Sequence, residues 1–227
     1  MVAEPSTRTV DRALALLATV CERSGANLVD TARDCDLAPS TALRLLRTLE
    51  TSGFVCKDEL GMYRPGPRII QLGAQALSNE SLIDLAKAAM EELATDTGES
   101  VYLSVEGHAA TALYIGIVEG THSVRHASWV GRTVRLETSA AGHALRGKVP
   151  DDGYVVVERG VETDVTAIAC PVYSQARIVA ALSLVVPSYR LTASQAKRHG
   201  RMLVSASADV SARLSSSPKP SLPEGPS

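Results

Sequence analysis

Residues 40–55 read STALRLLRTLETSGFV, and this stretch decides the fold of the first third of the chain. Its apolar residues recur at helical spacing, at Ala42, Leu45, Leu46 and Leu49. The pattern predicts an amphipathic helix that ends at Gly53. The opposite face carries hydroxyl and guanidinium groups, on Ser40, Thr41, Arg44, Arg47 and Thr48. Hydroxyls can hold phosphates and an arginine can hold a phosphate or a guanine edge, so this face is typical of a helix that reads DNA.

Two further helices are expected before this stretch. The apolar spacing predicts a first helix with Thr9 as its N-cap and Gly25 as its stop. A second, shorter helix is expected over 28–35, and the residues DLAP at 36–39 break it. The helix of residues 40–55 is therefore the third of a set.

A strand hairpin is expected after the third helix. A strand begins at 54–55, a turn follows at 59–61, and 62–64 return as the second strand. Three helices and a two-stranded ribbon, in this order, predict a winged helix-turn-helix. The wing adds Lys57 and Arg64 as candidate DNA contacts.

The charge of the chain is close to balanced. The formal net charge is -2, so no global basic field indicates a nucleic-acid partner. Between residues 37 and 68 five basic side chains stand against three acidic ones, a local balance of +2; the basic ones are Arg44, Arg47, Lys57, Arg64 and Arg68. This excess is modest, and the helix pattern by itself also fits the solvated face of an unrelated helical domain.

Helices also flank the second part of the chain. A linker helix is expected over 68–79, and a longer helix runs from a cap at Ser81 to Gly98. A capping box formed by Thr192 and Gln195 starts a last helix that reaches about residue 214. The Pro- and Ser-rich tail, 215–227, is expected to be disordered.

Between these helices the periodicity changes to that of strands. Val101, Leu103 and Val105 alternate with Tyr102, Ser104 and Glu106. More strands are expected at 111–118, 123–130, 153–157, 166–173 and 177–186. A mostly antiparallel sheet packed by helices gives an α+β fold class. The expected organisation is a DNA-binding domain at 1–67, a linker helix at 68–79, a second domain at 80–214 and a tail at 215–227.

The sequence offers no pattern typical of catalysis, of metal binding or of a cofactor site. None of the five histidines lies in a metal or hydrolase motif. His122 and His126 are four apart on an expected strand, which would separate them by roughly 13 Å. Cys170 has no evident base and is expected to be a buried, inert thiol. We expect no catalytic residue, no metal and no cofactor.

The cysteines, the apolar runs and the first residues indicate the location of the protein. The four cysteines lie far apart without a CxxC pair, which fits a reducing cytoplasm. No apolar run approaches the roughly 20 residues that span a bilayer. The first residues, MVAEPSTRTV, show no signal-peptide pattern. A cytoplasmic protein without membrane contact is expected.

Several stretches resemble the IclR family of regulators. STALRLLRTLETSGFV and MYRPGPRIIQLG, at 62–73, resemble its recognition helix and wing exit, and TVDRALALL, at 9–17, its first helix. The likeness continues through TGESVYLSV at 97–105, VGRTVRLETSAAGHAL at 130–145 and IACPVYSQARIVAALSLVVP at 168–187. The resemblance implies a repressor that binds double-stranded operator DNA as a homodimer or a dimer of dimers. It also implies a GAF-like second domain that binds a small-molecule effector.

The resemblance implies which residues line the effector pocket. Carried onto this chain they are His126, Ala140, Ala141, Val157, Val165, Ala167, Ser183 and Val185. The family often has an acidic residue at the position of Val157 and can have a polar one at that of Val185, so the valines favour an apolar or aromatic effector. The effector is also expected to carry a carboxylate. This group would meet backbone amides near Ala140 and Ala141, and the hydroxyl of Ser183. The same residues also fit a plain sheet core.

One departure from the family concerns the connection at 146–152. It is much shorter than the family's, whose extra residues form helices beside the pocket. The alternative function is a GAF-like sensor or enzyme with a helical N-terminal extension. An enzyme would need a nucleophile paired with a base, which the sequence does not offer, and would have no need of the face that carries Arg44 and Arg47.

Overall fold

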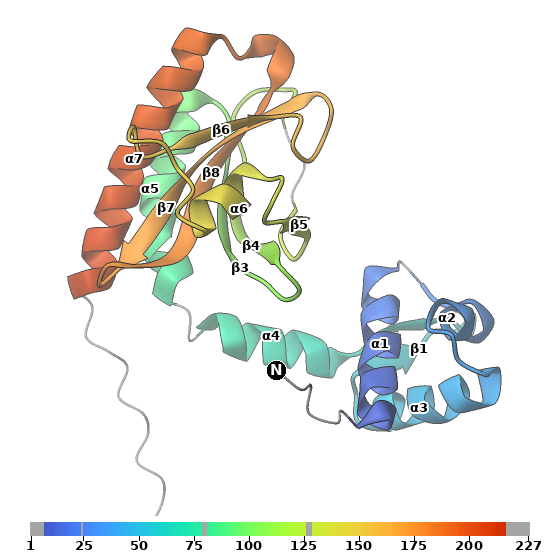
Figure 1. The fold of residues 1–227 in the computed structure, drawn as a ribbon. Coiled ribbons are helices and arrows are strands. Elements are labelled where there is room, and N and C mark those ends of the chain that lie inside the picture. Colours follow the sequence, from blue (N-terminus) through green and yellow to red (C-terminus); the bar gives the residue numbers. More distant parts are fainter. Residues whose placement is uncertain (1–6, 24, 79–80, 126–128, 217–227) are drawn as a thin grey trace, which may run out of the picture. The chain divides into compact units, whose positions relative to one another are not determined.

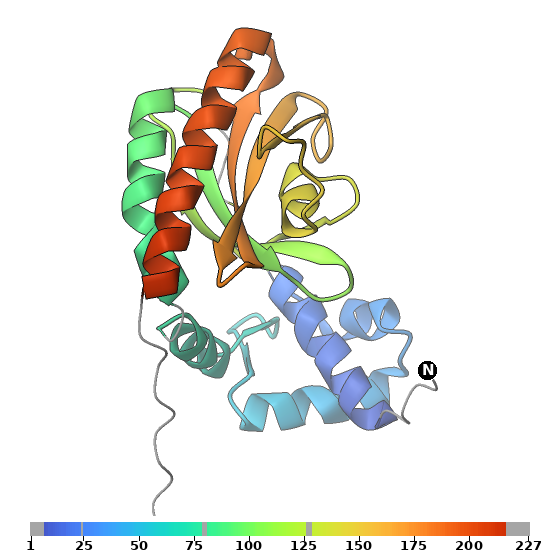
Figure 2. The same cartoon turned by 60° about the vertical axis from the view of Figure 1, so that its left-hand side comes forward.

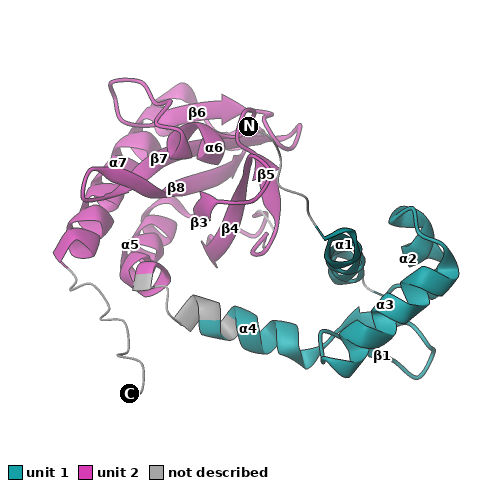
Figure 3. Cartoon of the chain, turned by 60° about the horizontal axis from the view of Figure 1, so that its bottom comes forward, with its two compact units in different colours: residues 1–79 teal, residues 80–227 magenta. Residues whose placement is uncertain are grey.

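The computed structural model describes residues 7–23, 25–78, 81–125 and 129–216 (Figure 1). The chain divides into two compact units, Met1–Asn79 and Glu80–Ser227, which Figure 3 shows in different colours. Among the described residues no helix is long and apolar enough to cross a membrane.

The first unit is a set of three helices followed by a two-stranded wing and a fourth helix. Its elements are α1 (Arg8–Glu22), α2 (Leu28–Asp34), α3 (Pro39–Thr51), β1 (Val55–Lys57), β2 (Tyr63–Pro65) and α4 (Pro67–Ser78). The wing strands are antiparallel, and Tyr63 also exchanges two backbone hydrogen bonds with Ala26 in the loop between α1 and α2. The wing is thereby fixed to the helices.

The core of the first unit follows the predicted helical pattern. It is made of Leu16, Val20, Ala26, Ala32, Ala42, Leu45, Leu46, Val55 and Tyr63. Ala42, Leu45 and Leu46 come from the apolar face of α3, so the opposite face of that helix is left at the surface. The prediction of a winged helix-turn-helix is confirmed.

Two helix starts differ from the prediction. Thr7, rather than Thr9, stands at the N-cap position of α1 and makes no side-chain capping hydrogen bond, and the helix ends at Glu22, before Gly25. α3 begins with Pro39 and not after it. Proline is favourable at the first helical position because its missing N–H would have no helical partner there. The end of α3 is as predicted, since Gly53 has a φ of 76° and the N–H of Phe54 donates to the carbonyl of Leu49.

The second unit is a six-stranded antiparallel sheet with helices on both faces (Figures 1 and 2). Its elements are α5 (Ser81–Thr97), β3 (Ser100–Glu106), β4 (Thr111–Val118), β5 (Thr133–Arg135), α6 (Ala140–Leu145), β6 (Val155–Glu158), β7 (Val165–Ser174), β8 (Arg177–Pro187), a 3-10 turn (Ser188–Arg190) and α7 (Ala193–Ser216). The strand order is β5-β4-β3-β8-β7-β6. The predicted α+β class is confirmed.

The two faces of this sheet differ in the size of their side chains. On the side of α5 and α7 the sheet presents mostly large aliphatic residues, such as Leu103 and Leu182. On the side of α6 it presents alanines together with Tyr102 and Tyr114. The small residues let α6 lie close, and a Cβ on Gly142 would be 2.3 Å from the backbone of Leu136. The glycine thus lets α6 pack directly on the chain that follows β5.

The strand predicted over 123–130 is wrong for its described part. Residues 121–125 follow no strand, and β5 instead lies at Thr133–Arg135. His126 lies outside the described residues, so the expected strand spacing of His122 and His126 has no support. The predicted capping box is confirmed, since the N–H of Thr192 donates to Gln195 Oε1 at 2.9 Å.

The last helix continues to Ser216, so 215–216, placed in the expected tail, are helical. The rest of that tail, 217–227, lies outside the described residues.

Candidate DNA-binding face and ligand pocket

The outward face of α3 is a continuous polar surface. Ser40, Arg44, Arg47 and Thr48 line a shallow groove along it together with Leu43, Thr51 and Ser52. Thr41 is half-buried at the edge of this face. Neither Arg44 nor Arg47 forms an ion pair within the described part of the chain, so both guanidinium groups are available to a partner. The predicted recognition residues are thus brought together on one surface.

Two hydroxyls of this face are engaged with their own helix. Thr48 Oγ1 donates to the carbonyl of Arg44 at 3.2 Å, and Thr51 Oγ1 donates to that of Arg47 at 2.9 Å. Such bonds fix the rotamer and leave the oxygen lone pairs as acceptors. These hydroxyls therefore help to hold the surface that the arginines project from.

The two predicted DNA contacts of the wing, Lys57 and Arg64, have different neighbours within the wing. Lys57 lies with Nζ 5.3 Å from the centre of the Tyr63 ring, a cation–π contact that supports its stem. Arg64 instead pairs with Asp58, with Nε donating to Oδ2 at 2.8 Å. Lys57 is exposed and has no ion-pair partner among the described residues, whereas Arg64 stabilises the wing turn.

Asp58 organises that turn. Its Oδ1 accepts the N–H groups of Leu60 at 3.0 Å and Met62 at 2.9 Å. The bond from Met62 and the one from Arg64 lower the pKa of the Asp58 carboxyl below its ordinary value. This carboxylate holds the tip of the wing in shape.

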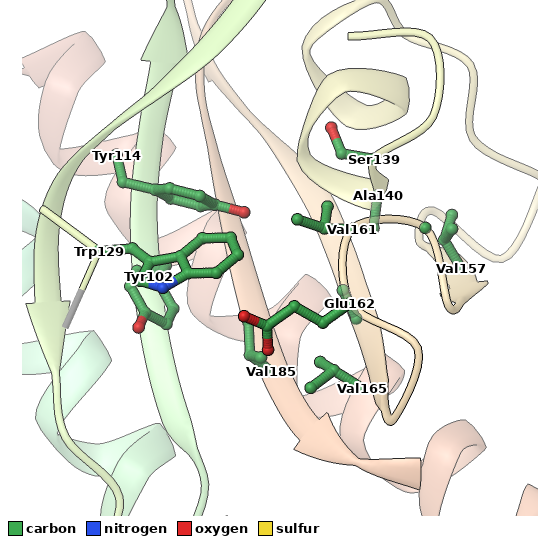
Figure 4. A pocket seen from close by; sticks show the side chains of 12 residues that line it. Tyr102, Tyr114, Trp129, Ser139, Ala140, Val157, Val161, Glu162, Val165 and Val185 are labelled. Carbon is green, nitrogen blue, oxygen red and sulfur yellow. The ribbon is translucent and has the colours of Figure 1, made fainter. Parts of the chain in front are cut away.

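The second unit contains a pocket between α6 and the sheet (Figure 4). Its cavity volume is about 20 Å³, enough for roughly one water molecule, so an effector has to widen the pocket when it binds. Its lining consists of Tyr102, Tyr114, Trp129, Ser139, Ala140, Val157, Gly160, Val161, Glu162, Val165, Ala167 and Val185.

Five predicted lining positions are among these residues, namely Ala140, Val157, Val165, Ala167 and Val185. Ala141 and Ser183 are buried, at 2% and 1% exposure, but lie outside the lining. His126 falls outside the described residues. The structure therefore brings together the three valines, Ala140 and Ala167 of the implied set, but not Ala141 or Ser183.

Ser183 is nevertheless close to the pocket. It pairs across the sheet with Tyr102 and Ala169, which belong to the cluster on the side of α6. Paired residues point to the same face of a sheet, so Ser183 points to the pocket side. Its Oγ has no hydrogen-bond partner among the described residues. A buried hydroxyl without a partner is costly, and a ligand or a water at this position would satisfy it.

The aromatic wall of the pocket was missed from the sequence. The rings of Tyr102 and Tyr114 lie 4.9 Å apart between centroids, and those of Tyr114 and Trp129 6.2 Å apart. Tyr102 was assigned to the polar side of an alternating strand. α6 covers that side too, so both faces of β3 are buried and the alternation carries less information. Trp129 is the only tryptophan of the chain, which was the signal that could have drawn attention to it.

The polar groups of the wall are neutral phenols. Burial raises the pKa of Tyr114 to about 12. Burial also raises the pKa of Tyr102, and the charges of nearby residues, Glu162 among them, add to the effect. At neutral pH both hydroxyls keep their protons and can donate hydrogen bonds.

Ser139 closes the pocket at the start of α6. Its Oγ accepts the N–H of Gly142 at 3.1 Å and donates to the carbonyl of Arg135 at 2.7 Å. The turn after β6 lies against this loop, because a Cβ on Gly160 would be 2.4 Å from the carbonyl oxygen of Thr138. The turn and the loop together form the mouth.

A metal ion and a cysteine nucleophile would each need particular side chains among the described residues. The described residues contain no group of three or more His, Cys, Asp or Glu side chains that could hold a metal ion. Cys170 is 1% exposed, and burial raises its pKa to about 12, as expected of an inert thiol.

A winged helix-turn-helix in one chain with an α+β domain that holds a small-molecule pocket defines a ligand-controlled transcription regulator of the bacterial type. The family comparison agrees with this class. The IclR helix-turn-helix domain matches residues 9–59, and the C-terminal domain of bacterial IclR transcriptional regulators matches 74–152 and 147–212. The chain belongs to the IclR family of DNA-binding transcription regulators and is not an enzyme.

Relatives of known role cover nearly the whole chain. The HTH-type transcriptional repressor AllR of Escherichia coli K12 is 25% identical over 251 residues, which cover 94% of this chain and 92% of AllR. The alignment is longer than the 227 residues of this chain, so this chain is shorter within the aligned region. The two C-terminal matches overlap at 147–152, where the sequence showed a short connection.

Solved structures share the fold. An IclR regulator from Alicyclobacillus acidocaldarius is 24% identical with a TM-score of 0.77, covering 92% of this chain and 100% of its own. An IclR homolog from Microbacterium hydrocarbonoxydans, solved with 4-hydroxybenzoate, is 21% identical with a TM-score of 0.78 over the same shares of the two chains.

Proposed function

We propose that this chain is a cytoplasmic repressor that binds an operator through α3 and the wing. A small molecule that binds in the pocket between α6 and the sheet, here called the Trp129 pocket, releases it from the operator. The observation that carries the DNA-binding part is the groove of α3, where Arg44 and Arg47 stand without ion-pair partners among the described residues. The repressing sign rests on the likeness to AllR. The pocket, with its apolar strands and aromatic wall, supports control by a small molecule.

The proposed operator contacts divide into two kinds. Arg44 and Arg47 are placed to read base edges or phosphates, with Ser40, Thr41 and Thr48 supporting them at the backbone. Lys57 contacts a phosphate, and Arg64 contributes by holding the wing turn. Base contacts give sequence preference, whereas phosphate contacts give affinity for any DNA.

The proposed assembly is a homodimer or a dimer of dimers. One winged helix-turn-helix covers few base pairs, and a two-fold dimer on a palindrome doubles the contacts. Val10, Leu14 and Ile70 are 52%, 58% and 72% exposed, which is apolar surface available for pairing. Light scattering at micromolar concentration should show a dimer or larger; a monomer with full operator affinity would contradict this part.

The proposed effector binds with its apolar body against Val157, Val165 and Val185. The IclR homolog from Microbacterium hydrocarbonoxydans binds 4-hydroxybenzoate, a small aromatic molecule, which supports an aromatic effector for this pocket with its aromatic wall. To change operator affinity tenfold, the effector must bind one state of the protein about 1.4 kcal/mol better than the other.

The test is a gel shift with DNA that flanks the encoding gene, with and without added small aromatic molecules. The proposal expects a specific shift that a bound effector weakens. A folded protein that binds no fragment of this DNA more tightly than unrelated DNA would contradict it. A shift that no pocket variant alters in its ligand response would contradict the effector part alone.

A further inference from the structure

The Trp129 pocket is almost filled by its own walls. Its cavity volume of about 20 Å³ holds roughly one water molecule. A cavity that takes up a benzene molecule is much larger, at roughly 150 Å³. A small aromatic effector therefore has to displace at least one wall. The walls are the sheet, the start of α6, the turn between β6 and β7, and the side chain of Trp129.

The sheet and the start of α6 are firmly held. The lining residues of the sheet lie on strands that pair with a neighbour on both sides, β3, β4, β7 and β8. At the start of α6, Ser139 is bonded both to the N–H of Gly142 and to the carbonyl of Arg135. A Cβ on Gly142 would be 2.3 Å from the backbone of Leu136, so this end of the helix is closely packed. Moving either wall would break these bonds or this packing.

The turn between β6 and β7, residues 159–164, has its backbone bonds at its two ends. At the first end the N–H of Arg159 donates to the carbonyl of Val165 at 3.0 Å. At the second end the carbonyl of Asp164 accepts the N–H of Ser188 at 2.8 Å. These bonds fix where the turn begins and ends, and they leave its middle to be placed by packing.

The middle of the turn separates the pocket from solvent. Within the described part of the chain, the backbone of Gly160 and Val161 makes no hydrogen bond with other backbone groups. Val161 lines the pocket and is also 44% exposed, and its side chain extends from the turn toward the pocket (Figure 4). The φ of Arg159 is 56°, a left-handed conformation that is unfavourable for an arginine, so a rotation at this residue can relieve strain.

We propose that the turn of residues 159–164 is the gate of the pocket, which moves away from the loop before α6 to admit the effector and stays displaced while the effector is bound. This gate rests on the proposed function, since it regulates access to the proposed effector site. The contact that closes it lies at Gly160, where a Cβ would be 2.4 Å from the carbonyl oxygen of Thr138. Only a glycine lets the turn lie so close to that loop.

Gly160→Ala should favour the open gate. Gly160 does not have a positive φ, so an alanine there strains no backbone dihedral. Its methyl would overlap the carbonyl of Thr138, which is backbone, and Val157 Cγ1, at 2.5 Å, which can shift as a side chain. The apparent affinity of a ligand rises with the fraction of the protein that is competent to bind it. We therefore expect this variant to bind about tenfold more tightly and to associate faster, whereas simple damage to the pocket would weaken binding.

Phenol is the probe, because it is a small neutral molecule that suits an apolar and aromatic lining. Trp129 is the single tryptophan of the chain and lines the pocket, so its fluorescence reports phenol binding at equilibrium and in stopped-flow mixing. The control is Gly116→Ala on β4, whose Cβ would be an ordinary 3.6 Å from Leu103 Cβ. It should leave the Kd and the association rate unchanged. Thermal unfolding shows that each variant is folded.

Exchange of backbone amide hydrogens, followed by mass spectrometry, gives a second measurement. In the Gly160→Ala protein without ligand, peptides that cover 159–165 should exchange at least threefold faster, and those of β7 that cover 166–174 should not change. In the original protein, saturating phenol should also speed exchange at 159–165, because the bound state has the gate displaced. This last measurement needs no variant.

Three results would overturn the gate. The first is phenol binding that Gly160→Ala weakens or leaves unchanged, which would place the opening in another wall, such as Trp129. The second is exchange at 159–165 that phenol slows in the original protein. The third is an emission that phenol does not alter in either protein up to the millimolar range. Operator binding is measured separately by gel shift, so failure of the gate and failure of the proposed function are distinguishable.

Discussion

The ring of Tyr114 on β4 lies 6.2 Å from the ring of Trp129, at an interplanar angle of 57°, and this contact forms one wall of the ligand pocket. Tyr114 is 5% exposed and Trp129 is half-buried. The buried ring thus supports the more accessible one, and the position of Trp129 depends on it.

Removing the ring of Tyr114 should therefore weaken ligand binding. Tyr114→Leu is expected to raise the Kd of a small aromatic ligand about fivefold, because one aromatic pair contributes roughly 1 kcal/mol. Tyr114→Phe keeps the ring and removes only the hydroxyl, so it should bind within about twofold of the original protein. A titration followed by the fluorescence of Trp129, the single tryptophan of the chain, measures both. Equal loss in the two variants would show that the hydroxyl, and not the ring, is what the ligand needs.

The mouth of the pocket offers a matched pair of valines. Val161 lines the pocket and is 44% exposed, whereas Val156 on β6 is 39% exposed and does not line it. Val161→Phe should narrow the pocket and weaken the binding of a small aromatic ligand about tenfold or more, at little cost to folding because the site is exposed. Val156→Phe should have no effect. A normal titration by the Val161→Phe protein would mean that ligands enter or bind elsewhere.

Asp58 gives the wing a dependence on pH. The lowered pKa means that the folded protein favours the carboxylate, so the stabilisation is complete above the ordinary value of 3.8 and is lost as the pH falls through the lower folded value. Thermal unfolding of Asp58→Asn should show a Tm below that of the original protein from pH 8 to about 5, with a difference that shrinks below 3.8. The neighbouring Glu59→Gln should show no such change. A difference that is constant down to pH 3 would contradict the bond pattern of the wing turn.

Lys57 should act on all DNA alike. It is exposed at the wing and supported by the ring of Tyr63, which suits a phosphate contact. Lys57→Ala is expected to weaken binding to operator and unrelated DNA by the same factor. It should also reduce the slope of log K against log salt by about 1 per protomer. Titrations at several salt concentrations measure this. A loss confined to the operator would instead assign Lys57 to a base.

The sequence predicted most of the first unit because its pattern is local. The apolar spacing of α3 and the glycine after it determine one buried face and one helix end. The start of α3 was misjudged, since Pro39 can either break a helix or begin one, and only its neighbours decide. Periodicity says which face is buried but not where a helix starts.

The second unit was harder because distant residues determine its irregular parts. The strand expected over 123–130 looked regular in sequence. Arg190 Nη1, however, donates to the carbonyl of Val124 at 2.8 Å, while two other nitrogens of the same guanidinium donate to the carboxylate of buried Glu99. These bonds join residues 66 and 91 positions apart, so no local pattern announces them.

The pocket also combines residues that local sequence patterns predict with residues that they do not. The valines and alanines of its floor lie on regular elements and could be carried over from the family resemblance. Glu162 lies in a turn without periodicity, and the tyrosines were hidden by a sheet that is covered on both faces. The aromatic wall of the pocket therefore emerged only from the folded chain.

The central claim is that α3 reads operator DNA, and one comparison of variants tests it most directly. Fluorescence anisotropy of labelled DNA that flanks the encoding gene measures the affinity of Arg44→Ala and of Arg23→Ala. Arg23 is an arginine of the same unit that pairs with Asp34 away from the α3 groove. We expect Arg44→Ala to lose about 1–3 kcal/mol of operator binding and to retain its binding to unrelated DNA more fully, with Arg23→Ala unchanged. Operator binding of a folded Arg44→Ala protein equal to that of the original would contradict the account.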